Sequence, residues 1–197
     1  ISYYKKDYIN EGQQEFNEGE PIKSADYLEY LSYKEANPID LDKISSGEEL
    51  RSYRIAIACT QQYSNFHGGT TESTLAGMVT TLNRVNEVYE TELSIRLIMI
   101  DNNDSLIDYS LDWGMDNYNT GALINQSQEV IDEFIGNDNY DIGHTFSTGA
   151  GGLASLGVPC KTNQKGNGVT GTNSPTGDPY DIDYVAHEIG HQFGANH

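Results

Sequence analysis

Short apolar segments alternate with amphipathic segments along the middle of the chain. Residues 53–59 are apolar and bounded by polar turn residues, which is typical of a buried strand, and residues 93–100 and 140–147 have the same character. Between them, apolar side chains recur every three or four positions in residues 75–89 and 124–135, and this spacing predicts amphipathic helices. Strands that alternate with helices predict an α/β fold with a mainly parallel sheet.

The first fifty residues have a different character. They are rich in acidic side chains, and helical spacing is weak and confined to residues 25–34. We interpret residues 1–50 as a leader, a prodomain remnant or a linker, and residues 51–197 as the main domain. The alternative is an N-terminal subdomain that is integral to the fold.

The overall charge limits the function classes. The 197 residues include 30 Asp and Glu against 11 Lys and Arg, a net charge of −19, which repels nucleic-acid phosphates and anionic membranes. No apolar run is long enough for a membrane span. We therefore expect no nucleic-acid partner and no membrane span. Calcium binding is possible but has no support from an EF-hand motif.

The start of a helix is indicated near the C-terminal end of the sequence. Asp178 has the form of an N-cap, Pro179 suits the first helical position, and Asp181 is an acidic residue in the first turn. We expect a helix to begin here and to continue through the histidines that follow.

Three histidines on this helix and after it have the spacing of metal ligands. His187 and His191 are four residues apart, so their imidazoles lie on one face, about one turn apart. Gly194 can adopt the left-handed conformation that ends the helix, and the turn would bring His197 back as a third ligand. Three neutral histidines leave a tetrahedral Zn²⁺ its fourth position for water.

The residue after the first ligand supplies the remaining chemistry. Bound zinc lowers the pKa of its water and polarises a carbonyl, while Glu188 can take the proton of that water and pass it to a leaving amine. We therefore predict one catalytic Zn²⁺ held by His187, His191 and His197, with Glu188 as the catalytic residue.

Residues 187–197 (HEIGHQFGANH) resemble the metzincin zinc-peptidase signature. Residues 148–160 are similar to the glycine-rich edge strand of the adamalysin/reprolysin family, and residues 51–197 look closest to its bacterial secreted branch. The resemblance implies a metzincin N-terminal subdomain. Its sheet is mixed, mostly parallel and twisted, with an antiparallel edge strand, and its long helices include the zinc-binding active-site helix.

The resemblance also implies an activity. A secreted zinc-dependent endopeptidase of this family hydrolyses peptide bonds of extracellular proteins through a zinc-bound water. Its substrate lies extended along the edge strand, where small side chains let another backbone approach. The alternative for this stretch is a flexible glycine loop without ligand contact. The residues that match the substrate strand are Gly149, Ala150, Gly151, Gly152, Leu153 and Ala154.

The sequence departs from the family pattern after the third ligand. The C-terminal subdomain of metzincins, which carries the Met-turn, is absent from this chain. We expect the C-terminal part of the same catalytic domain as a partner. It would cover apolar residues of the zinc helix, among them Val185, Ile189 or Phe193.

Further candidates are weaker. His144 lies in an apolar strand, so a core histidine is favoured over a fourth metal ligand. Residues 16–20 (FNEGE) resemble the acidic latency switch of another metzincin branch, but an exposed acidic turn is the favoured interpretation. Cys59 is expected to be unpaired, with a bridge to Cys160 as the alternative. By resemblance, Cys160 bonds to a cysteine in the C-terminal subdomain.

Two other functions compete with a peptidase. One is a non-catalytic metal-binding adhesion module, and the other is a different zinc hydrolase. Glu188 argues against the adhesion module, because a structural zinc site needs no general base and usually has a fourth protein ligand.

Overall fold

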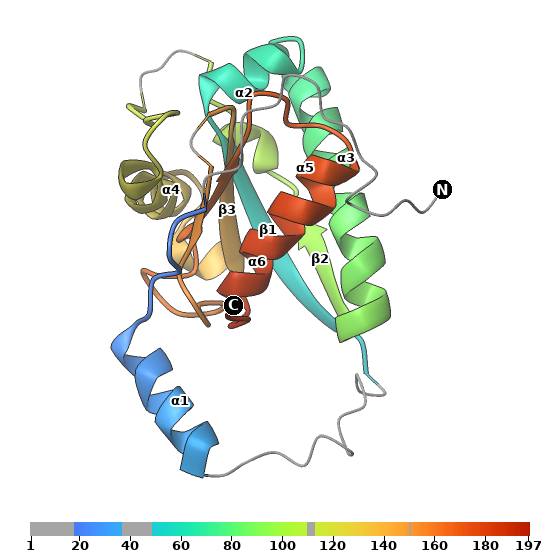
Figure 1. Ribbon diagram of the computed structural model, residues 1–197. Helices are drawn as coiled ribbons and strands as arrows, with labels where there is room; N and C mark the ends of the chain where they lie inside the picture. Colours follow the sequence, from blue (N-terminus) through green and yellow to red (C-terminus); the bar gives the residue numbers. More distant parts are fainter. Residues whose placement is uncertain (1–17, 37–48, 110–112, 150) are drawn as a thin grey trace.

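The fold is built on a five-stranded sheet, seen in a computed structural model that describes residues 18–36, 49–109, 113–149 and 151–197. The strand order is β2-β1-β3-β5-β4 (Figure 1). Neighbouring strands are parallel except for β4, which runs antiparallel to β5 at the edge. The mostly parallel sheet with an antiparallel edge strand confirms the predicted fold class. The strands are β1 (Arg51–Cys59), β2 (Ile95–Met99), β3 (Ile142–Ser147), β4 (Gly152–Ala154) and β5 (Gly168–Gly171).

Helices cover both faces of this sheet (Figure 1). The long helix α3 and the helix that carries the histidines pack on one face, and α4 packs on the other. The histidine helix is continuous but has three parts, of which the middle one is π-helical. The helices are α1 (Ala25–Ala36), α2 (Gln61–Phe66), α3 (Thr71–Leu93), η3 (Asn103–Leu106), α4 (Thr120–Phe134), η4 (Asn137–Asn139), α5 (Asp178–Tyr180), the π-helical η5 (Asp181–Ala186) and α6 (His187–Gln192).

Strand β1 divides the core into two layers. Ile55 and Ile57 point toward α3 and the histidine helix, whereas Ala56 and Ala58 point toward α4. All four side chains are fully buried. This alternation is the period of two that a strand imposes on its side chains. The predicted strands and helices are therefore confirmed, and α1 forms where the weak helical spacing suggested it.

The start of the histidine helix differs from the prediction. Gly177, with a φ of 76°, is the N-cap, and no side chain caps this end. Asp178 lies inside the first turn, and its carboxylate accepts hydrogen bonds of 2.9 and 3.0 Å from the guanidinium of Arg84. Asp181 is buried and accepts a hydrogen bond from the Thr81 hydroxyl. Both carboxylates therefore bond to side chains of α3 instead of capping the helix N-terminus.

The expected apolar face of the zinc helix is also different. Val185 and Ile189 are buried in the core with α3 and β1, so the prediction that they lie exposed is wrong. Phe193 is partly buried, with its ring 5.0 Å from that of Tyr53. The apolar residues of this helix pack against the sheet and α3, so the described part of the chain already buries them.

The two cysteines are not bonded to each other. Cys59 is buried at the end of β1, and Cys160 is exposed. This confirms the expectation of an unpaired Cys59 and excludes the Cys59–Cys160 bridge in this structure.

Among the described residues, none forms a helix with the length and apolarity that crossing a bilayer requires.

We predict that Tyr89→Phe lowers the free energy of unfolding by about 1–3 kcal/mol. The buried Tyr89 hydroxyl donates a 2.6 Å hydrogen bond to the carbonyl oxygen of Ala186, directly before the first histidine. Urea unfolding measures the loss. Tyr30→Phe is the matched control, because Tyr30 is half exposed and should change stability by less than about 0.5 kcal/mol. Equal effects of the two variants would contradict the role of the Tyr89 hydroxyl.

Candidate metal centre

The three histidines converge on one point at the end of the helix. His187 and His191 lie one turn apart on α6, and their Nε2 atoms are 3.0 Å apart. The chain then turns at Gly194, whose φ of 100° is in the region that favours glycine. The turn brings Nε2 of His197 to 3.4 Å from Nε2 of His187. The predicted ligands are therefore brought together.

The protonation of His191 suits a metal ligand. Its Nδ1 lies 2.7 Å from the carbonyl oxygen of Ala195. A carbonyl oxygen can only accept, so Nδ1 carries the hydrogen and the lone pair of the neutral ring is on Nε2. Second partners of this kind commonly orient metal-binding histidines. The backbone after α6 thus directs the free nitrogen of His191 toward the other two imidazoles.

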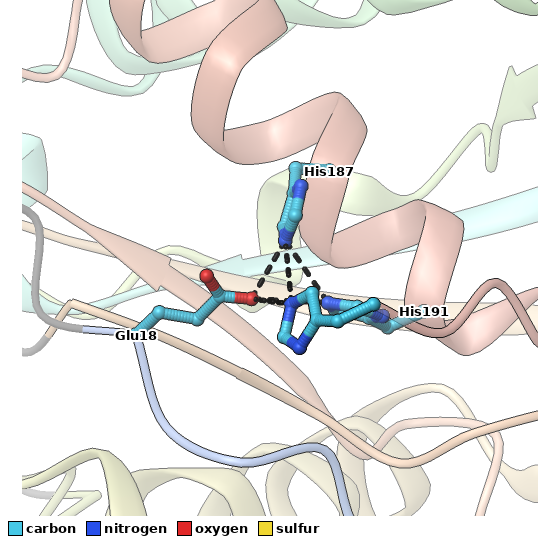
Figure 2. A group of neighbouring side chains, drawn as sticks. Glu18, His187 and His191 are labelled. Atoms are coloured by element: carbon cyan, nitrogen blue, oxygen red, sulfur yellow. Dashed lines mark hydrogen bonds and ion pairs between the residues drawn. The ribbon is translucent and has the colours of Figure 1, made fainter.

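A carboxylate from the N-terminal region completes the group. Oε1 of Glu18 lies 2.6 Å from Nε2 of His187, 3.1 Å from that of His191 and 2.6 Å from that of His197. Figure 2 shows the Glu18 carboxylate pointing at His187 and His191. Partial burial raises the pKa of Glu18, but hydrogen bonds from the three imidazoles together lower it, to about 2.

This contact corrects the interpretation of residues 16–20. Glu18 is exposed, as the favoured interpretation expected, but it lies in an extended pairing with Gly152 rather than in a turn, and its carboxylate faces the histidines. Phe16 and Asn17 lie outside the described residues. The short acidic motif was the only signal in the sequence for this contact. Nothing in the motif indicates that it meets residues about 170 positions away.

The donor set fits a zinc ion. The four ligand atoms of Glu18, His187, His191 and His197 all lie within 4.8 Å of one another. Ligand atoms at zinc distances of about 2.0–2.1 Å in a tetrahedral site are about 3.3 Å apart. The separations here are 3.0 and 3.4 Å between nitrogens and 2.6 to 3.1 Å from Oε1 of Glu18. Nitrogen atoms with facing lone pairs repel each other at such distances unless a cation or a proton lies between them. The group can therefore hold a metal, with three nitrogen ligands and one oxygen ligand.

Glu188 lies beside the ligands with its carboxylate unsatisfied. The residue is fully buried, and neither Oε1 nor Oε2 has a hydrogen-bond partner. Burial, together with the nearby charge of Glu18, raises the pKa of Glu188 to about 9. A buried carboxyl group without partners is costly, which makes Glu188 a candidate for a chemical role.

His144 is a core residue, as predicted, and not a ligand. It is fully buried on β3, with Nδ1 2.8 Å from Oε1 of Gln192 and Nε2 2.8 Å from Oγ1 of Thr170. The amide nitrogen of Gln192 donates a 2.8 Å hydrogen bond to the carbonyl of Gly143. These bonds attach the end of α6 to β3 and β5, and so hold the histidines in position.

The residues matched to a substrate strand lie at the sheet edge. Gly152, Leu153 and Ala154 form β4, and Gly151 accepts a hydrogen bond from the backbone of Gly171. Gly149 lies two residues before Gly151, and Ala150 between them is outside the described residues. The side of β4 that faces away from β5 is bonded to the backbone of residues 18–22.

Comparison with known families agrees with this geometry. The α/β fold places three converging histidines beside a buried glutamate, a donor set that suits a metal-dependent hydrolase. The chain matches the model of the reprolysin-like metallopeptidases of family M12B over residues 50–197, and it belongs to this family. None of the curated proteins that were compared with the chain matches it significantly.

We predict a pH-dependent stability that originates in His144. Burial lowers the pKa of His144 to about 4, so the imidazole is neutral in the folded protein at pH 7, whereas it titrates at about 6.5 in the unfolded chain. The unfolded state therefore binds more protons between about pH 6.5 and 4, and the free energy of unfolding falls as the pH falls through this range.

His144→Gln should remove this contribution. We expect the wild type to lose up to about 3 kcal/mol more than the variant between pH 7 and 4, measured by urea unfolding at each pH. The variant starts from a lower stability at pH 7, so the slopes rather than the absolute values are compared. Identical slopes would show that folding does not lower the pKa of His144.

Proposed function

We propose that the protein is a zinc-dependent endopeptidase that hydrolyses peptide bonds of extracellular proteins. One observation carries the proposal: three Nε2 atoms converge beside the buried, unpartnered carboxylate of Glu188. Membership of the M12B family supports a peptidase that uses a metal. The reprolysin-like peptidases are commonly extracellular, which supports secretion.

In this proposal His187, His191 and His197 bind one Zn²⁺. When bound, the ion supplies Lewis acidity toward a substrate carbonyl and lowers the pKa of water. The positive charge of a bound ion would oppose the burial that raises the pKa of Glu188 and would favour its ionised form. Glu188 would then accept a proton from the attacking water and donate it to the amine nitrogen as the peptide bond breaks. Its burial excludes bulk water, which strengthens its electrostatic interaction with the reacting atoms.

The substrate would bind in extended form along β4. Gly152 and Ala154 have small side chains, and the outer edge of β4 offers backbone donors and acceptors. Glycine at 149 and 151 allows the same close approach. The hydrogen bonds that residues 18–22 make to this edge support its capacity to pair with an extended chain.

The division of the chain follows from the same proposal. Residues 51–197 form the catalytic unit through the zinc ligands, and residues 1–50 are a leader, prodomain remnant or linker. The C-terminal part of the catalytic domain would be a further partner. An adhesion module is disfavoured. Burying the unpartnered carboxyl group of Glu188 costs stability, and an adhesion module has no reaction in which to use that group.

We predict that His187→Ala combined with His191→Ala lowers zinc affinity by at least about 100-fold, because even partners outside the ligand shell contribute 10- to 100-fold. The measurement is the zinc content after dialysis against a competing chelator. His67→Ala is the control, since His67 lies outside the cluster. Zinc retained at one ion per chain by the double variant would contradict the ligand assignment.

We also predict that Glu188→Gln in the full-length protein keeps zinc but lowers turnover of a quenched peptide or casein by about 10²- to 10⁴-fold. Glu188→Asp should also be poor, because its carboxylate is withdrawn by roughly 1 Å. Glu129→Gln, a change at an exposed carboxylate on α4, should leave turnover unchanged. Wild-type turnover by Glu188→Gln would exclude this residue as the general base, and a chelator-resistant activity would exclude the metal.

A further inference from the structure

A segment of the chain's own N-terminal region lies on the edge of the sheet. The segment of residues 18–22, here called the strap, runs parallel to β4. The amide of Gly19 donates to the carbonyl of Gly152, and the amide of Ile22 donates to that of Ala154, both at 2.8 Å. The strap thus uses the main-chain groups that an extended peptide would need.

The strap also supplies an atom to the metal centre. Oε1 of Glu18 lies within 3.1 Å of all three Nε2 atoms. A single carboxylate oxygen this close to three ring nitrogens, two pairs of which are themselves 3.0 and 3.4 Å apart, is an arrangement that a shared cation would hold together. The same positions suit the fourth corner of a tetrahedral site.

Helix α1 anchors the strap on the other side of the centre. Tyr27 is 4 % exposed, while Tyr30 and Tyr33 on the same helix are at least half exposed. The Tyr27 hydroxyl donates a 3.1 Å hydrogen bond to the carbonyl of Gly194, in the turn that leads to His197. In Figure 1, α1 lies at the end of the molecule where α6 ends. The N-terminal region is therefore attached on both sides of the histidines.

Close packing reinforces this anchor. A Cβ atom built on Gly157 would come within 3.1 Å of the Tyr27 ring, so the ring rests directly on the loop after β4. The carbonyl of Ile22 accepts a hydrogen bond from the amide of Leu156 in the same loop. Strap and anchor hence contact one continuous surface formed by β4, the following loop and the Gly194 turn.

We propose that Glu18 is a fourth ligand of the metal and that residues 18–27 act as an internal inhibitor. This inference rests on the proposed zinc site. With Glu18 at the fourth position, no water can bind there, and with the strap on β4 no substrate backbone can pair. Because the segment is tethered to the domain, it competes with substrate at an effective concentration on the order of millimolar.

The proposal can be tested by metal substitution without measuring turnover. The chain is loaded with Co²⁺, whose visible absorption spectrum reports its ligands, and is titrated with acetohydroxamate, a small metal-binding probe. The variants are Glu18→Gln and, as a matched control, Glu20→Gln. Glu20 is exposed two residues further along the same segment and is not part of the metal-binding group.

We expect the wild type and Glu20→Gln to share one spectrum and to bind acetohydroxamate weakly. Glu18→Gln should have a different spectrum and bind the probe at least about tenfold more tightly, because the fourth position is then open in a larger fraction of molecules. Tyr27→Ala keeps all ligands but loosens the anchor, so it should tighten probe binding by a smaller factor.

Each result separates the inference from the zinc site itself. If the wild type binds one Co²⁺ but Glu18→Gln matches it in spectrum and probe affinity, Glu18 is not a ligand and the inhibitor role is wrong, while the proposed peptidase stands. If wild type and Glu20→Gln fail to take up Co²⁺, the metal site is wrong and this inference fails with it. Unchanged probe affinity in Tyr27→Ala would exclude the anchoring role of α1.

Discussion

The metal centre depends on one buried amide, that of Gln192. Its nitrogen donates to the carbonyl of Gly143, and its oxygen accepts from His144 on the same strand. A Cβ atom on Gly168 would come within 2.6 Å of this amide, so β5 needs glycine where the helix crosses it. Because Gln192 directly follows His191, these contacts fix the rotation of α6 about its axis. A turn of the helix away from this position would separate the imidazoles from the edge of the sheet.

Hydrogen bonds from two different elements hold the two ends of α6. Its N-terminal side is bonded to α3 through Tyr89, and its last carbonyl accepts from the amide of Val158 in the loop after β4. The loop that holds the end of the helix is therefore the continuation of the edge strand. The edge strand β4 and the candidate metal ligands share this loop, so the distance between them is set by short backbone links.

The parts that could be predicted from the sequence are those with local signals. The i, i+4 spacing of His187 and His191 and the glycine before His197 dictate their convergence through helix geometry alone. The strands and helices followed from apolar periodicity. The helix N-cap was mispredicted because Arg84 and Thr81, distant in sequence, attract the carboxylates of Asp178 and Asp181.

The position of Glu18 could not be derived from the sequence for a related reason. A strand pairing between residues 18–22 and β4 depends on backbone groups that every residue has, so no side-chain pattern records it. Burial of Val185 and Ile189 was missed because the rotation of the zinc helix is set by Gln192 and His144, which are tertiary contacts. The core position of His144 was recognisable because Ile142 and Phe146, two positions away on either side, are apolar.

The covalent link between the strap and the domain makes binding of the strap insensitive to dilution. While both belong to one chain, the occupancy of the edge and of the metal centre does not depend on protein concentration, because the contact is intramolecular. A single backbone cut between α1 and β1 would turn the same contact into a bimolecular one, whose occupancy falls as the pieces diffuse apart. After such a cut, dilution would make release of the strap effectively one-way.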